Sequence, residues 1–182
     1  MEIICFGDSI TRGYDVPYGR GWVEICDASI EGVNFTNYGV DGCSVQAMIY
    51  NIENWAVTTV SDPMRHIFLM CGTNDILQGR DSAYVFKTLV KAIELASTKG
   101  KVIIGLETQI DSDMDGLDLV VREVNEQLKA YAEAHDIKVI DFYTTLFEAD
   151  QIGQIVFAGE VHPNELGYRL MAYKALEVFT RL

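Results

Sequence analysis

The chain has 182 residues, of which 49% are hydrophobic and 23% are charged, a composition typical of one globular domain with a buried core. Acidic residues outnumber basic residues by 27 to 14, and the resulting net charge of −13 disfavours nucleic acid and anionic lipid as partners. No run of about 18 apolar residues is present, so we expect no membrane span, and we expect a single domain over residues 1–182.

The beginning of the chain and its cysteines indicate a compartment. No charged segment followed by an apolar stretch and a small-residue cleavage site precedes the first apolar run, which begins at residue 3. The cysteines show neither paired nor metal-ligand spacing; they are Cys5, Cys26, Cys43 and Cys71. We therefore expect a reduced, cytoplasmic protein without metal or cofactor, and the sequence leaves the oligomeric state open.

Apolar runs alternate with segments of helical periodicity along the whole chain. Buried strands are expected at residues 3–6, 66–71, 102–106 and 137–142, and a half-covered edge strand at 33–38. Helices with one apolar face are expected at about 20–30, 45–55, 81–100 and 117–132, and from about 164 onward. This alternation predicts a three-layer α/β/α sandwich around a five-stranded parallel sheet with flavodoxin-like strand order.

The first strand leads directly into Gly7-Asp8-Ser9. Ligands of open α/β sheets bind at the carboxyl ends of the strands, and a glycine there allows a sharp turn and a close approach of substrate. Ser9 is thus a candidate nucleophile. Asp8 and Ser9 are also good N-cap residues, so the alternative interpretation is that they only cap the next helix.

Three more loops of unusual composition are expected at the same edge of the sheet: 37–42, 72–75 and 159–164. A serine hydroxyl needs a base, and histidine suits that task near neutral pH. Of the three histidines, His66 opens a strand and His135 ends a helix on the opposite side. His162 alone is expected at the active edge, followed by the turn-fixing Pro163.

Acyl transfer also requires hydrogen-bond donors for the developing oxyanion. Asn74 can offer its side-chain amide, Gly39 its backbone N–H, and Ser9 its own N–H. Each glycine-rich or asparagine-rich loop could by itself be an ordinary turn. We expect function because all four occur in this order at consecutive strand ends.

These four segments resemble the sequence blocks of the SGNH hydrolases, also called GDSL-type esterases and lipases. Ser9 matches the nucleophile, although Ile10 follows it where the motif name has leucine. Gly39, Asn74, and His162 with Pro163 match the other three blocks. The resemblance spans residues 3–182 and implies the three-layer fold that the periodicity also predicts.

The resemblance implies a serine hydrolase that cleaves carboxylic esters of small molecules without a cofactor. Ser9 would attack the carbonyl, His162 would act as base, and Asp8 would fix the turn by hydrogen bonds. The alternatives are thioester hydrolysis, removal of acetyl groups from sugars, and a ligand-binding protein that has lost catalysis. The third alternative stays open because the histidine block is unusual.

The family places an aspartate three residues before the histidine, but this chain has Gly159 there, followed by Glu160. The group that orients His162 is therefore predicted to be either the Glu160 side chain or a backbone carbonyl near Ala158 and Gly159. We favour the carbonyl, because a residue two before the histidine need not turn back toward its ring.

The segment Asp111–Asp115, followed by Gly116, is similar to the start of a calcium loop, but the twelfth position is Arg122 rather than glutamate. We interpret it as an acidic, solvated loop that caps the next helix. We also expect residues 107–118 to form an acidic wall of the substrate site.

Overall fold

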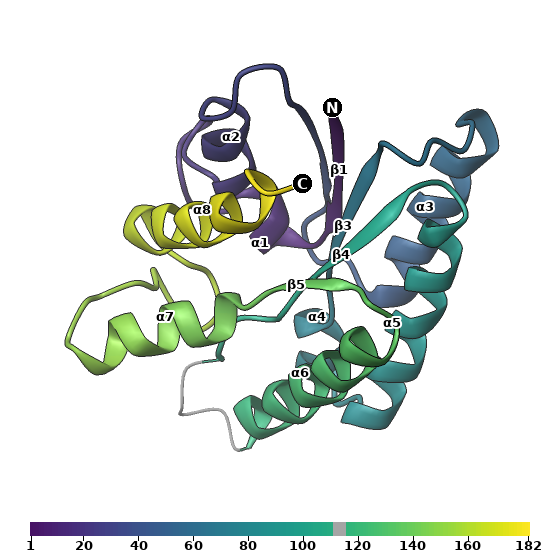
Figure 1. Cartoon of the computed structure of the whole chain (residues 1–182). Coiled ribbons are helices and arrows are strands. Elements are labelled where there is room, and N and C mark those ends of the chain that lie inside the picture. The colour runs from purple at the N-terminus through teal and green to yellow at the C-terminus, as the bar shows by residue number, and fades with distance from the viewer. Residues whose placement is uncertain (111–115) are drawn as a thin grey trace.

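The computed structural model describes residues 1–110 and 116–182. Within these residues, one parallel sheet has the strand order β2-β1-β3-β4-β5 (Figure 1). The strands are β1 (Glu2–Gly7), β2 (Asn34–Gly39), β3 (His66–Met70), β4 (Lys101–Gly105) and β5 (Lys138–Ile140). The parallel sheet and the flavodoxin-like order are as predicted.

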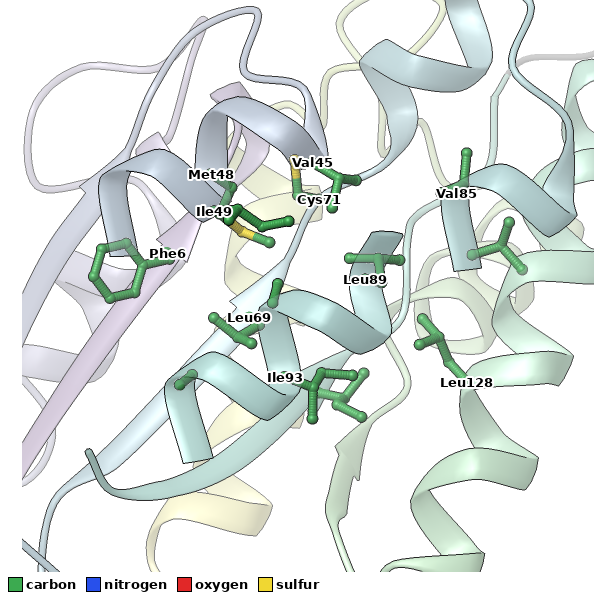
Figure 2. Close-up of a cluster of buried hydrophobic side chains, with 14 of the residues drawn as sticks. Phe6, Val45, Met48, Ile49, Leu69, Cys71, Val85, Leu89, Ile93 and Leu128 are labelled. Carbon is green, nitrogen blue, oxygen red and sulfur yellow. The ribbon is translucent and has the colours of Figure 1, made fainter. Parts of the chain in front are cut away.

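Helices cover both faces of this sheet (Figure 1). One face is covered by α3 (Val45–Thr58), α5 (Ser82–Ser97) and α6 (Leu117–Ala134), and the other by α2 (Trp22–Asp27), α7 (Phe142–Gln151) and α8 (Glu165–Phe179). Figure 2 shows the hydrophobic core on the face covered by α3, α5 and α6, where Leu69 lies among side chains of α3 and α5. Full burial of one such side chain contributes about 1.5–3 kcal/mol, so the two cores hold the three layers together.

Three helices were not predicted from the sequence: α1 (Ser9–Arg12), α4 (Thr73–Leu77) and α7. The first two are too short to show a helical period. The last replaces the end of a strand that was predicted to reach Phe142. Asp141 caps it by accepting both the N–H and the hydroxyl of Thr144 at 2.9 Å, and β5 therefore ends at Ile140.

Two glycines allow close packing at the ends of β1 and β2. A Cβ on Gly7 would overlap the carbonyl oxygen of Met70, and a Cβ on Gly39 would overlap the backbone of Arg12. The end of β2 therefore lies against the first turn of α1. In the described part of the chain, none of the helices has the length and hydrophobicity needed to cross a bilayer.

Candidate active site

Ser9 is the first residue of α1, directly behind its N-cap Asp8. Asp8 Oδ1 accepts the Ile10 N–H at 2.9 Å, so the capping interpretation of Asp8 is correct. Capping does not engage the Ser9 hydroxyl, whose Oγ lies 2.9 Å from His162 Nε2 although the residues are 153 positions apart. The fold thus brings together the two residues that the sequence singled out as nucleophile and base.

His162 lies in a tight loop before α8. Its carbonyl oxygen accepts the Ala158 N–H at 2.9 Å, and the Tyr14 ring packs against the imidazole with 4.6 Å between the centroids. Desolvation lowers the pKa of His162, and the carboxylates of Asp15 and Asp41 oppose this shift. The imidazole is therefore neutral at neutral pH, the form that can accept a proton from serine.

The second ring nitrogen of His162 has no hydrogen-bond acceptor within residues 1–110 and 116–182. The predicted backbone carbonyls of Ala158 and Gly159 make no bond to it, and Glu160 is exposed to solvent. The nearby negative charges come instead from Asp15, in the loop after α1, and from Asp41, in the loop after β2. The geometry is that of a serine–histidine dyad.

Asn74 lies half-buried in α4, and its Nδ2 donates to the carbonyl oxygen of Cys43 at 3.1 Å. A primary amide has two such hydrogens, so one remains for a substrate oxygen. The Ser9 N–H, at the start of α1, has no acceptor among the described residues. The bond to Cys43 places the side chain of Asn74 beside the turn that follows β2.

Gly39 is differently placed from what the sequence suggested. Its N–H donates to Asn37 Oδ1 at 2.9 Å and is not free for a substrate, and its lack of a side chain serves packing against α1. Gly42 immediately precedes Cys43, has a φ of 69°, and its N–H has no acceptor in the described residues. Sequence reasoning missed Gly42 because a left-handed backbone position cannot be distinguished from an ordinary turn glycine.

The other two histidines lie away from the site, His66 at the start of β3 and His135 at the end of α6. The expected acidic wall is wrong at Glu107, because this side chain is only 1% exposed and accepts a hydrogen bond from Thr73 Oγ1 at 2.6 Å. Asp111–Asp115, the possible calcium loop, lies outside the described residues. Within the described ranges, no group of three or more metal-ligating side chains occurs.

Two cavities lie on either side of the end of β2, and both are lined by Asn37 and Gly39. One, of about 690 Å³, includes Arg12 and Tyr14, and Tyr14 contacts His162. The other, of about 530 Å³, is lined only by uncharged residues: Phe6, Asn37, Tyr38, Gly39, Val40, Asn51, Asn54, Trp55 and Thr58. The first cavity therefore lies next to the Ser9–His162 pair, on the Tyr14 side.

A family model described as "GDSL-like Lipase/Acylhydrolase family" matches residues 5–170. Among curated proteins, no sequence matches the chain. The crystal structure of a member of the lipolytic protein G-D-S-L family from Veillonella parvula DSM 2008 is 93% identical, with a TM-score of 0.98 over 100% of both chains.

Two carbohydrate esterases share the fold at low sequence identity. A catalytic mutant of an acetylxylan esterase from Geobacillus stearothermophilus is 17% identical, with a TM-score of 0.80 over 97% of this chain and 92% of that one. A carbohydrate acetylesterase from Sinorhizobium meliloti is also 17% identical, with a TM-score of 0.81 over 100% of this chain and 99% of that one.

Proposed function

The chain belongs to the GDSL-like lipase and acylhydrolase family, and from this premise we propose that it hydrolyses carboxylic esters through an acyl-enzyme on Ser9. The observation that carries the proposal is the 2.9 Å contact between Ser9 Oγ and His162 Nε2. A serine hydroxyl is a weak nucleophile until an adjacent base takes its proton, and this contact supplies that base.

In the proposed reaction, Ser9 Oγ forms a bond to the ester carbonyl carbon as His162 Nε2 takes its proton. Collapse of the tetrahedral intermediate breaks the bond to the alcohol, which leaves with the proton from His162. Water, deprotonated by the same imidazole, then releases the acid. The oxyanion is held by the Ser9 N–H, by Asn74 Nδ2 and by the Gly42 N–H, which replaces the Gly39 N–H that the sequence predicted.

Labelling with a fluorophosphonate tests this proposal, because only an activated serine reacts rapidly. We expect the wild-type chain to be labelled and to hydrolyse nitrophenyl esters, and Ser9→Ala to lose both properties while keeping its melting temperature. Wild-type protein that is neither labelled nor active would support the alternative of a binding protein without catalysis. Activity remaining in a rigorously purified Ser9→Ala variant would exclude Ser9 as nucleophile.

A second candidate, removal of acetyl groups from carbohydrates, is favoured by the uncharged cavity. In a chain of net charge −13, a cavity lined by aromatic rings and carboxamides without a charged side chain suits a neutral sugar. The two esterases of the same fold, which act on acetylated carbohydrates by their descriptions, agree with this idea.

Kinetics on two substrates test this second candidate. We expect Trp55→Ala to raise KM for acetylated xylooligosaccharides but to leave nitrophenyl acetate hydrolysis unchanged. Tyr50→Ala is the control, because Tyr50 is an exposed aromatic on the same helix but does not line the cavity. Equal effects of Trp55→Ala on both substrates, or no release of acetate from the oligosaccharide, would contradict a sugar site here.

A further inference from the structure

Two fully buried carboxyl groups lie close behind the proposed catalytic residues. Asp8 is 0% exposed and Glu107 is 1% exposed. Each has one oxygen, Asp8 Oδ2 and Glu107 Oε1, that is buried and has no hydrogen-bond partner among the described residues. A buried oxygen without a partner is costly, so this pair requires a physical explanation.

The register of the sheet brings these two carboxyl groups toward each other across β3. Gly7 pairs with Met70 and Leu69 pairs with Ile104, so Asp8 and Glu107 stand just beyond the ends of the two strands that flank β3. Strands lie about 4.8 Å apart, which puts the two backbones about 10 Å apart, a gap that one Asp and one Glu side chain can nearly span.

Gly72, at the end of β3, leaves the space between them free. It has no side chain, and a Cβ built on it would lie 3.7 Å from Glu107 Oε1. The oxygen of Glu107 that lacks a partner among the described residues therefore lies over Gly72. Carboxylate oxygens only accept hydrogen bonds, so the two groups can satisfy each other only if a proton lies between them.

We propose that Glu107 is a neutral carboxylic acid that donates its proton to the Asp8 carboxylate, and that it thereby positions both halves of the active site. This inference rests on the proposed function only for its effect on catalysis. Asp8 directly precedes Ser9 in the chain. On its other oxygen, Glu107 Oε2 accepts the hydroxyl hydrogen of Thr73 at 2.6 Å, and Thr73 directly precedes Asn74.

The backbone of Glu107 is itself held in place from α6. Its N–H donates to Asn125 Oδ1 at 3.0 Å, and its carbonyl oxygen accepts Asn125 Nδ2 at 2.9 Å. With its main chain anchored there, Glu107 links the turn that carries the nucleophile to the helix that carries the oxyanion donor. It is a positioning residue, since it does not touch the reacting atoms.

The surroundings of the pair favour the neutral acid. Burial raises the pKa of Glu107 well above its ordinary value, and burial raises the pKa of Asp8 to about 7. The titratable groups that face the pair are Asp75 of α4, the thiols of Cys43 and Cys71, and the phenol of Tyr168 of α8. All of them are neutral or negative, so none stabilises a second negative charge.

The sign of the pH dependence follows from these raised pKa values. The folded state holds the proton more tightly than the unfolded chain, so the stability that the pair provides is fully present below the ordinary carboxyl pKa of about 4 and decreases as the pH rises above it. The decrease continues through about pH 7 and is complete once the pH exceeds the raised pKa values of the pair, where two adjacent buried carboxylates repel each other.

Glu107→Gln separates this role from a purely structural one. The amide can donate to Asp8 and accept from Thr73 without titrating, so we expect kcat at neutral pH within about threefold of wild type, because both hydrogen bonds remain. We expect the fall in melting temperature with rising pH, and the fall in kcat at alkaline pH, to be smaller than in wild type. Glu107→Ala loses both bonds and should lower kcat about a hundredfold, the scale of a small misplacement.

Glu53→Gln, at an exposed position of α3, controls for the change in charge and should keep the wild-type pH dependence of melting temperature and kcat. The proposal would be overturned if melting temperature and kcat depended on pH as strongly in Glu107→Gln as in wild type. It would also be overturned if folded Glu107→Gln lost as much kcat at neutral pH as Glu107→Ala.

Infrared difference spectroscopy of the wild-type chain gives a test that does not depend on a variant that folds. We expect a carboxylic-acid C=O band that disappears across the alkaline transition, and its absence would also overturn the proposal. Melting curves and infrared bands require no ester turnover, so Ser9→Ala should show the same fall in melting temperature with rising pH and the same infrared transition. A failure of the esterase proposal can thus be distinguished from a failure of this one.

Discussion

Asn74 uses one amide hydrogen to bind the turn after β2, and in the proposed reaction the other binds the substrate oxyanion. We expect Asn74→Ala to cost about 3 kcal/mol of transition-state stabilisation, the typical value for one oxyanion donor. Because the interaction forms as charge develops, the loss should appear in kcat rather than in KM. Steady-state kinetics with a nitrophenyl ester measures both, and a change confined to KM would make Asn74 a substrate-binding residue instead.

The pKa of His162 sets the acid limb of the proposed reaction. Desolvation lowers this pKa and the charge of Asp15 raises it, so Asp15→Asn should lower it further. The base then stays neutral to lower pH, and the acid limb of the kcat profile should move to lower pH. Asp15 has a φ of 66°, which asparagine tolerates, so the backbone should not change. An acid limb that stays in place or moves upward would show that Asp15 does not act on His162.

Glu160 is exposed, and nothing in the structure places it against the imidazole. We expect Glu160→Gln to lose less than about tenfold in kcat, far below the loss of about 10⁴ when a true triad carboxylate becomes an amide. The measurement is kcat at neutral pH with melting temperature as the control for folding. A loss near a thousandfold in a folded variant would make Glu160 the third member of a triad.

At the scale of elements, α7 depends on a single local signal. Asp141 caps the helix through Thr144, and the buried face of α7, including Phe142 and Leu146, packs in the core beneath α8. Asp141→Ala should lower the free energy of unfolding by about 1 kcal/mol, the usual cost of losing an N-cap. Urea unfolding measures this, and Asp141→Asn, which still accepts the Thr144 N–H, should lose less. Equal losses in both variants would assign the effect to charge, including the 3.4 Å ion pair with Lys129.

For the whole molecule, calcium binding to the folded state would raise the melting temperature, because a ligand that binds only the folded chain stabilises it. The acidic segment 111–115 lacks the glutamate of a calcium loop at the twelfth position, so we predict that millimolar calcium changes neither melting temperature nor ester hydrolysis. A rise in melting temperature that EDTA reverses, and that magnesium does not reproduce, would show a calcium site.

The sequence by itself determined the layered architecture, because strand and helix periods are local. The apolar run at residues 3–6 and the stripe at 117–132 each report which face is buried, and alternation of the two kinds of element selects a parallel sheet. The parallel topology then predicts which loops share an edge, and so it pointed to Ser9, Asn74 and His162 before any distance was known.

Only the tertiary structure decided how these residues meet. The contact of Ser9 with His162, the engagement of the Gly39 N–H by Asn37 and the left-handed backbone of Gly42 all depend on backbone angles and on packing between distant segments. Glu107 was predicted to be part of an acidic surface because the position of a residue in the sequence does not show how deeply its side chain is buried. Its burial over Gly72, across β3 from Asp8, follows from the register of three strands, and register is fixed by the packing of the whole sheet against its helices.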